Sequence, residues 1–391
     1  MNLDPIDCGF VPLVDCAPLV VARELGFAAE EGLDLRLHPQ PSWSAIRDQL
    51  VFGDLQAAHM LSVLPVAMSM GLGGAATRID ALSVLSVNGD VIGVTPALAA
   101  RMQDVGVARD RDRATAVGRA LIAAAHGPLR IGVPFPFSMH AELLYYWLSA
   151  LGLEAPRDLD VHTVPPPRMA EAMASAEIDA FCVGEPWGSI AVDHGDAEIV
   201  LPGVSIWQFA PEKVLAVRHD WAESNHQLSH RLIRAAWRAA RWLSDAENRM
   251  TVSDILARSE YLDRPAEVID RALSGRLVLA QQGRPVQMPG LLEFFDCAAT
   301  FPWRSQAVWI AKRWAARAGV DRAIAVRAAR ECYRTDLYRA ALTAIGVDVP
   351  GASEKVEGAL AVRTEVASWK GEMFLGPDRF FDGEVFDPSE K

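Results

Sequence analysis

Three side chains in this sequence carry N–H groups that could hold a small anion: the indole of Trp43, the imidazole of His140 and the ammonium of Lys213. Charge-assisted hydrogen bonds from such donors are about twice as strong as neutral ones. Each residue also has a plainer interpretation, because a tryptophan can pack under a loop, a histidine can lie at the surface, and a lysine is usually solvated. The elements that position these residues decide between the interpretations.

The segments that carry these residues lie next to predicted strands. Short β-like runs alternate with helical patterns through the first half of the chain, which is typical of a parallel α/β architecture. Open α/β sheets bind ligands at the carboxyl ends of their strands. Trp43 and His140 follow predicted strands and open predicted helices, so helix N–H groups would point toward the same place. Strands are predicted over residues 7–13, 33–39, 81–87, 91–94, 129–133, 161–164, 178–183 and 214–217, with 81–87 and 91–94 as an extended pair about Asn88-Gly89.

From about residue 229 onward the pattern becomes predominantly helical. The first of these predicted helices has one apolar face and one face that carries a stripe of arginines. The stripe consists of Arg231, Arg234, Arg238 and Arg241. It could be a surface where a partner docks, but a solvated helix face is the favoured interpretation.

Composition limits the classes of function. A length of 391 residues predicts two lobes with separate cores. Fifty acidic against 38 basic residues give a net charge of −12, which repels nucleic acid and anionic lipid, so we expect neither direct nucleic-acid binding nor membrane association. The sequence lacks the GxSxG, HExxH, GxxxxGK[ST] and EF-hand motifs. It therefore predicts a non-enzymatic protein without a metal or cofactor.

The cysteines and the N-terminus bear on the cellular compartment. The five cysteines are an odd number, widely spaced and without a CxxC pair, which favours reduced core thiols over disulfides or a zinc site. Residues 1–5 contain the acidic Asp4 and no Lys or Arg, whereas a secretory signal needs Lys or Arg followed by an apolar run. The expected location is the cytoplasm.

Several short motifs in fixed order resemble those of one family. They are residues 9–15, 17–19, 42–50, 58–61, 88–90, 134–136 with His140, 184–187 and 211–213. In this order and spacing they resemble the nitrate- and bicarbonate-binding (NrtA/CmpA-like) solute-binding proteins of ABC transporters. The resemblance covers about residues 7–221 well and continues more loosely through residues 301–305.

The resemblance implies a two-lobed type II periplasmic-binding-protein fold, an α/β fold with a largely helical C-terminal region. The first lobe would comprise residues 1–95 and 211–391, and the second lobe residues 96–210. The lobes would close around the ligand without making or breaking a bond. Carried over motif by motif, the ligand-contacting positions fall on Trp43, Asn88, Gly89, Asp90, His140, Pro166, Val183, Glu185 and Lys213.

Two of these positions bear on the identity of the ligand. The family's bicarbonate binders carry an acidic group at the position of Lys213, whereas a lysine suits an obligate acceptor such as nitrate or nitrite. The family's third turn position is typically a glutamine, but this chain has Asp90. Because an ionised carboxylate repels an anion, Asp90 is expected to turn away, to pair with His140 or Lys213, or to be protonated.

The acidic start and Lys213 together favour the sensor branch of this family. In that branch the anion-free protein holds an ANTAR-type (NasT-like) RNA-binding antiterminator, and the anion-bound protein releases it. One alternative is a transporter-associated nitrate- or bicarbonate-binding protein. Another is an enzyme on the same scaffold, because thiamine-pyrimidine synthases share the fold and use a histidine with iron, although this chain lacks their clustered cysteines.

Overall fold

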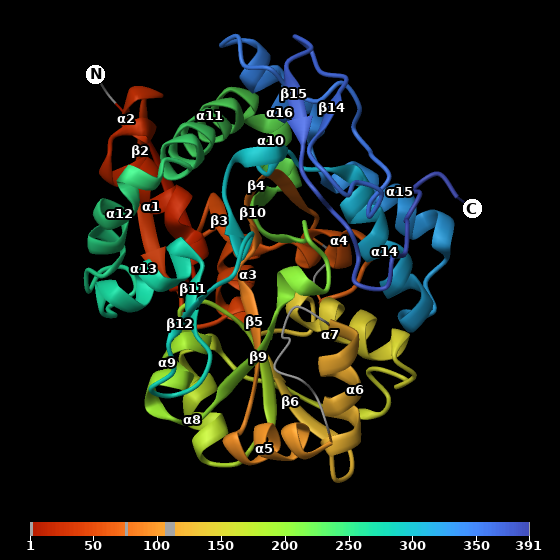
Figure 1. Cartoon of the computed structure of the whole chain (residues 1–391). Helices are drawn as coiled ribbons and strands as arrows, with labels where there is room; N and C mark the ends of the chain where they lie inside the picture. The colour runs from red at the N-terminus through yellow and green to blue at the C-terminus, as the bar shows by residue number, and fades with distance from the viewer. Residues whose placement is uncertain (1–2, 75–76, 106–113, 391) are drawn as a thin grey trace.

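The chain folds into two lobes, each built around one β-sheet. The computed structural model describes residues 3–74, 77–105 and 114–390. The lobe that contains the N-terminal strands lies above the other lobe in Figure 1, and the C-terminal helices flank their junction. No helix within these ranges is long and apolar enough to cross a membrane.

The first sheet has six strands in the order β13-β4-β10-β3-β1-β2. β1 is parallel to both β2 and β3, whereas β10 is antiparallel to β3 and β4. Alternating Leu33, Leu35 and Leu37 bury one face of β2, as period-two patterning predicts. The bounds are β1 Asp4–Phe10, β2 Leu33–Pro39, β3 Ala57–Leu61, β4 Ile79–Asn88, β10 Pro211–Arg218 and β13 Leu292–Glu293.

The second sheet has five strands in the order β7-β6-β8-β5-β9. β6 is parallel to β7 and β8, and β5 is antiparallel to β8 and β9. The bounds are β5 Asp90–Val94, β6 Leu129–Val133, β7 Leu159–Thr163, β8 Ala180–Gly184 and β9 Glu198–Pro202. The chain enters this sheet after β4 and returns to the first sheet through residues 203–210, so two segments connect the lobes.

The first crossing corrects a sequence prediction. Residues 81–87 and 91–94 do not pair with each other, because β4 belongs to the first sheet and β5 to the second. Asn88 and Gly89 have φ angles of 59° and 105°, and this turn sends the chain into the other sheet instead of closing a hairpin. Residues 90–94 therefore belong with the second sheet, although the sequence assigned them to a first lobe ending at residue 95.

Helices cover both sheets. In the first half they are α1 Ala17–Glu24, α2 Phe27–Glu30, α3 Trp43–Phe52, α4 Val63–Ser69, α5 Pro96–Asp104, α6 Ala114–Ala124, α7 Met139–Ala150, α8 Met169–Ala174 and α9 Trp187–His194. They continue as α10 His219–Ser224, α11 His226–Leu243, α12 Arg249–Leu256, α13 Ala266–Ser274, α14 Arg304–Ala318, α15 Arg322–Cys332 and α16 Thr335–Thr343. Two small hairpins join β11 Arg276–Val278 to β12 Pro285–Gln287, and β14 Thr364–Val366 to β15 Met373–Leu375. The region after β10 is thus largely helical, as expected.

The apolar core runs through the lobe junction. One cluster of buried side chains includes Leu13 and Trp43 of the first lobe together with Val91 and Val183 of the second. A second cluster fills the other face of the first sheet, beneath α1, α11 and α12. All five cysteines are free thiols, and all but Cys297 are buried.

The arginine stripe on α11 is not simply solvated. Arg231 donates to the Glu31 and Gly32 carbonyls and pairs with Asp4, while Arg234 pairs with Glu31. Arg238 binds the acidic residues that end α2. The stripe therefore docks α11 onto the start of the same chain, and the expectation of a solvated face is wrong for these three arginines.

Candidate functional site

Lys213 lies at the centre of a buried cluster between the lobes. Its Nζ is 2.7 Å from Asp15 Oδ2 and 2.7 Å from Glu212 Oε1, and it lies 5.4 Å from the centre of the Trp43 ring. The side chain is 0% exposed, so the interpretation of a solvated lysine is wrong. A lysine buried this deeply needs charged partners, since removing an unpaired charge from water is costly.

A β-bulge places Glu212 and Lys213 together. Successive residues of a regular strand point to opposite faces of the sheet. Against β4, however, Pro211 pairs with Val87 and Lys213 pairs with Ser86, so Glu212 is an extra residue on β10. Such a bulge redirects side chains locally. It allows the carboxylate of Glu212 to reach the ammonium of its own neighbour.

Trp43 reaches the cluster from the start of α3. Ser42 caps this helix, because its Oγ accepts a hydrogen bond from Ala45 N at 3.2 Å. The indole lies 5.5 Å from the ring of His59 on β3, and His59 Nε2 is 3.0 Å from Asp15 Oδ1. Trp43 Nε1 is buried and has no hydrogen-bond partner in the part of the chain that the structure describes. It is therefore an available donor.

The second lobe contributes His140 from the first turn of α7. Ser138 caps this helix, since its Oγ accepts a hydrogen bond from Ala141 N at 3.2 Å. His140 is fully buried, and its Nδ1 lies 3.1 Å from Glu212 Oε1. Asp90, His140 and Glu212 offer polar atoms that all lie within 4.8 Å of one another. These residues come from β5, α7 and β10, so the cluster joins both sheets (Figure 1).

Gly184 of the second lobe lies close to residues of the first lobe. A Cβ atom at this residue would lie 2.6 Å from Leu13 Cδ2 and 3.7 Å from both Asp15 Oδ2 and His140 Nε2. A larger residue would therefore displace at least the side chain of Leu13. The glycine thus lets the end of β8 contact the cluster through its backbone.

The charges of Lys213 and Asp15 stabilise each other. Burial alone would lower the pKa of Lys213, but Asp15 and Glu212 outweigh burial and hold this pKa above its ordinary value. Burial would raise the pKa of Asp15, but Lys213 and His59 hold it well below the usual range. At neutral pH these two residues form a buried ion pair.

The other titratable groups of the cluster are shifted toward their neutral forms. Burial, reinforced by Asp90 and Asp15, raises the pKa of Glu212 to about 8, although Lys213 opposes this shift. Burial also raises the pKa of Asp90. Burial and the nearby ammonium lower the pKa of His140 well below its ordinary value. The imidazole is therefore neutral, so one of its nitrogens donates a hydrogen bond and the other accepts one, depending on the tautomer.

Asp90 and Glu185 are buried carboxyls with local partners. Asp90 Oδ2 accepts a hydrogen bond from Cys182 Sγ at 3.4 Å, and a Cβ on Gly203 would lie 2.2 Å from Asp90 Oδ1. Glu185 Oε2 accepts a hydrogen bond from Ser189 N at 3.3 Å, and burial raises the pKa of Glu185 to about 7. Asp90 therefore borders the cluster and packs toward its own lobe, whereas Glu185 is anchored to α9.

Asn88 and Gly89 shape the crossing between the lobes. Asn88 Nδ2 donates to the carbonyls of Gln208 and Gly290, and its Oδ1 accepts from Ala210 N. Its side-chain amide is thus occupied, and the expected ligand contact through this side chain is not supported. The Gly89 carbonyl accepts a hydrogen bond from Glu185 N at 3.0 Å.

Val183 and Pro166 are buried apolar residues of the second lobe. Val183 is fully buried in β8, opposite Val91 of β5. Pro166 is buried at the start of the short 3-10 helix Pro166–Arg168, which follows β7. Proline has no backbone N–H, so Pro166 can line a site but cannot donate to an anion.

Four residues of the cluster were not predicted individually. They are Asp15, His59, Gly184 and Glu212, and each lies inside one of the motifs that carry the family resemblance. The motifs were therefore an available signal. The pairing with Lys213 was not, because it depends on the bulge in β10 and on contacts between lobes.

The lobes are closed over the cluster. Val14 N donates to the Glu185 carbonyl at 2.9 Å, and Trp187 Nε1 donates to the Pro12 carbonyl at 2.8 Å. On the side of α14, Arg317 pairs with the buried carboxylate of Glu142 on α7. These contacts join residues of the first sheet's lobe and the C-terminal helices to the second lobe.

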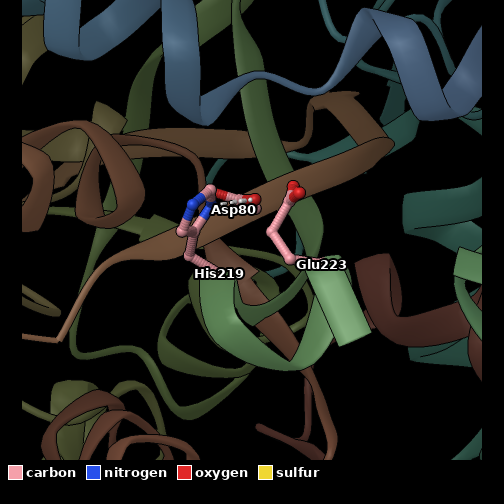
Figure 2. A group of neighbouring side chains, drawn as sticks. All are labelled: Asp80, His219 and Glu223. Atoms are coloured by element: carbon pink, nitrogen blue, oxygen red, sulfur yellow. Dashed lines mark hydrogen bonds and ion pairs between the residues drawn. The ribbon is translucent and has the colours of Figure 1, made fainter. Parts of the chain in front are cut away.

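A second group of similar residue types lies away from this junction. Figure 2 shows Asp80 of β4 facing His219 of α10, with Glu223 one turn further along α10. His219 Nδ1 lies 2.9 Å from Asp80 Oδ2, and Arg334 Nη1 lies 2.8 Å from the same oxygen and 2.6 Å from Glu223 Oε1. The guanidinium occupies the place of a cation, so this group is a structural ion network and a poor metal site.

Comparison with known proteins places the chain in a family. The NMT1-like family model matches residues 2–257. The nitrate/nitrite binding protein NrtA of Synechococcus elongatus is 30% identical over 401 residues, which cover 98% of this chain and 83% of that protein. The nitrate import ATP-binding protein NrtC of Synechocystis is 33% identical over 311 residues, covering 78% of this chain but 45% of NrtC. This chain thus spans about half the length of NrtC.

Solved structures agree with the sequence relatives. The crystal structure of the periplasmic nitrate-binding protein NrtA from Synechocystis superposes with a TM-score of 0.83 and 28% identity, covering 99% of this chain and 96% of that one. The aliphatic sulphonate binding protein SsuA of Escherichia coli, with a TM-score of 0.56 and 14% identity, shares the fold. Fold and relatives together define a two-lobed solute-binding protein and not an enzyme. The chain belongs to the NMT1-like family and, within these relatives, to the NrtA-like solute-binding proteins.

Proposed function

We propose that this protein binds nitrate or nitrite in the cluster around Lys213. The observation that supports this proposal most directly is the ammonium of Lys213, which is fully buried at the lobe junction and lies 5.4 Å from the ring of Trp43. Trp43 Nε1 and His140 Nε2 are buried without hydrogen-bond partners among the described residues. A planar oxyanion is an acceptor that can use several such donors at once. The nitrate/nitrite binding relatives support this choice of ligand.

Anion binding would be coupled to closure of the lobes. Lys213 and Trp43 belong to the first lobe, and His140 belongs to the second. An anion that contacts all three binds the closed arrangement better than any open one, so it shifts the population toward the closed form. Binding is therefore expected to change how the faces of the two lobes are presented to a partner.

The test is calorimetric titration with nitrate, nitrite, bicarbonate and sulfate. Nitrate or nitrite is expected to bind, and Lys213→Glu is expected to abolish binding because it places a carboxylate beside the anion. Lys355→Glu is the matched control, since Lys355 is also held by two carboxylates, Glu357 and Asp378, but outside the cluster. A response to bicarbonate alone, or equal losses in both variants, would contradict the assignment.

We further propose that the protein is a cytoplasmic sensor of the NasS type, which holds an ANTAR-type (NasT-like) antiterminator until the anion binds. The family resemblance of the motifs and the coupling of ligand to closure support this role. In a pull-down with such an antiterminator, saturating nitrate is expected to release the complex, and cell fractionation is expected to find the protein in the cytoplasm. A complex that persists unchanged at saturating nitrate would contradict the proposed sensor role.

A transporter-associated binding protein is the second candidate. The relatives named for nitrate import and for nitrate/nitrite binding favour it. The two candidates predict opposite effects of the anion on partner binding. A sensor releases its partner when the anion is bound, whereas a transport component delivers the anion-bound form to its partner. Comparing partner capture with and without nitrate therefore separates them.

A further inference from the structure

The cluster around Lys213 contains more negative than positive groups. Its carboxyls are Asp15, Asp90 and Glu212, and Lys213 is its cation; none of the four residues is more than 2% exposed. With every carboxyl ionised the cluster would carry a net charge of two negative. A monovalent anion would then enter a buried site that already repels it.

The ammonium cannot offset this charge alone. Asp15 already pairs with Lys213 at 2.7 Å and stays ionised. Glu212 is the second carboxyl at 2.7 Å from the same nitrogen. An anion that approaches Lys213 must therefore compete with both, unless one of them carries a proton.

Glu212 and Asp90 are carboxyls whose surroundings leave one oxygen able to hold a proton, and of these two Glu212 is the one that contacts Lys213. Its Oε2 is buried and has no hydrogen-bond partner within the described ranges, and the same is true of Asp90 Oδ1. A protonated carboxyl would also add an O–H donor to the site. Burial and the neighbouring carboxylates raise the pKa of Glu212 to about 8, which agrees with this geometry.

The groups that face Glu212 come from every element packed around it. They are Lys213 of β10, Asp15 of the 3-10 helix Val14–Cys16, Asp90 of β5, His140 of α7, Cys182 of β8 and Tyr333 after α15, while His59 of β3 lies behind them against Asp15. The two histidines are neutral because burial lowers their pKa values. Tyr333 donates its hydroxyl to the Ser62 carbonyl at 3.0 Å and remains neutral. Lys213 is thus the one cation within this set.

We propose that Glu212 is a proton-binding residue and that the anion enters this site together with a proton on Glu212. This inference rests on the proposed anion binding. On the alkaline side of about pH 8, the proton that Glu212 takes up offsets the charge of the anion, whereas at lower pH Glu212 carries its proton before the anion binds. Affinity is then constant where Glu212 is already protonated and falls where binding must draw the proton from solvent.

The direct test is titration of the wild-type protein with nitrate, an anion that does not itself titrate, between pH 6 and pH 9.5. The dissociation constant is expected to stay constant on the acid side of about pH 8 and to rise by up to about tenfold per pH unit on the alkaline side, as for one linked proton. Near pH 9, heats measured in buffers of different ionisation enthalpy are expected to show uptake of close to one proton. A flat profile with no proton uptake overturns the inference.

Variants assign the proton to a residue. Glu212→Gln keeps a polar partner for Lys213 but cannot titrate, so it is expected to bind nitrate with no alkaline loss. Glu357→Gln is the matched control, because Glu357 is a fully buried carboxyl that pairs with Lys355 outside the cluster, and its profile is expected to match wild type. An alkaline loss that persists in Glu212→Gln overturns the assignment.

Two further outcomes remain distinguishable. If Glu212→Gln does not fold, the buffer-dependent heats of the wild-type protein still decide whether a proton is taken up, and Asp90→Asn then shows whether Asp90 holds it instead, which would also overturn the assignment. If nitrate does not bind at any pH, the proposed function fails, and the inference fails with it. If nitrate binds without proton uptake, the inference about Glu212 is wrong while the proposed function stands.

Discussion

Two groups in this molecule are built from the same residue types, an Asp, a His and a Glu near one cation, yet they differ in what they can do. One contains Asp90, His140 and Glu212 with Lys213, and the other contains Asp80, His219 and Glu223 with Arg334. The first is buried between the lobes, whereas in the second the His219 and Glu223 side chains are 33% and 47% exposed.

The difference lies in how the cation is used. Arg334 is a planar fork that binds Asp80, Glu223 and Asp336 at once, and the Glu223 and Asp336 side chains are 47% and 51% exposed, so solvent screens the negative charge that the guanidinium does not offset. Lys213 is a point charge in a dry site, where Trp43 Nε1 and His140 Nε2 lack partners in the described part of the chain. Unsatisfied buried donors beside a cation leave capacity for a ligand, while a satisfied network contributes mainly to stability.

The largest expected effect comes from removing the cation of the inter-lobe cluster. In Lys213→Met, Asp15 loses its main counter-charge in a dry site, and such losses cost roughly 3–5 kcal/mol of unfolding free energy. Anion binding is expected to disappear as well. Urea unfolding and nitrate titration measure the two effects. Retained nitrate affinity in a folded Lys213→Met protein would remove the distinction between the two groups.

Removing the other cation is expected to affect stability alone. In Arg334→Met the fully buried Asp80 loses its guanidinium partner and keeps its contact with His219, and a loss of about 3 kcal/mol is expected from breaking a buried pair. Nitrate affinity is expected to remain within about twofold of wild type, because this group lies away from the lobe junction. A large loss of affinity would show that the two groups are coupled.

A smaller effect is expected from the indole of the cluster. Trp43→Phe removes the Nε1 donor and keeps most of the buried ring, so nitrate affinity is expected to fall by roughly tenfold, equivalent to about 1.4 kcal/mol for a hydrogen bond to a charged acceptor. Melting temperature serves as the control for packing. Unchanged affinity would place the anion away from Trp43.

The smallest effect is expected at the exposed end of the second group. Glu223→Gln removes one charge from a side chain that is 47% exposed, and exposed ion pairs contribute about 0–1 kcal/mol. Stability is expected to change by less than about 1 kcal/mol, and nitrate affinity not at all. Urea unfolding at low and high salt measures the effect, and a salt-independent loss near that of Arg334→Met would contradict this ranking.

The sequence located the donors better than their partners. Trp43 and His140 could be placed because each follows a serine cap at the start of a helix, a signal carried by neighbouring residues. The partners of Asn88 could not be predicted, since a turn motif does not reveal that its amide donates to the carbonyls of Gln208 and Gly290, far along the chain. The same limit produced the wrong pairing of residues 81–87 with 91–94.

What the sequence determined by itself is the α/β pattern, the two-lobed class and the positions of Trp43, His140 and Lys213, because periodicity, caps and motif order are local properties. Only the tertiary structure decided the charge of the site. Glu212 reaches Lys213 through a bulge against β4, and Asp15 reaches it from the 3-10 helix Val14–Cys16 that follows β1. Protonation depends on burial and on such distant neighbours, since a low-dielectric interior strengthens each charge–charge contact.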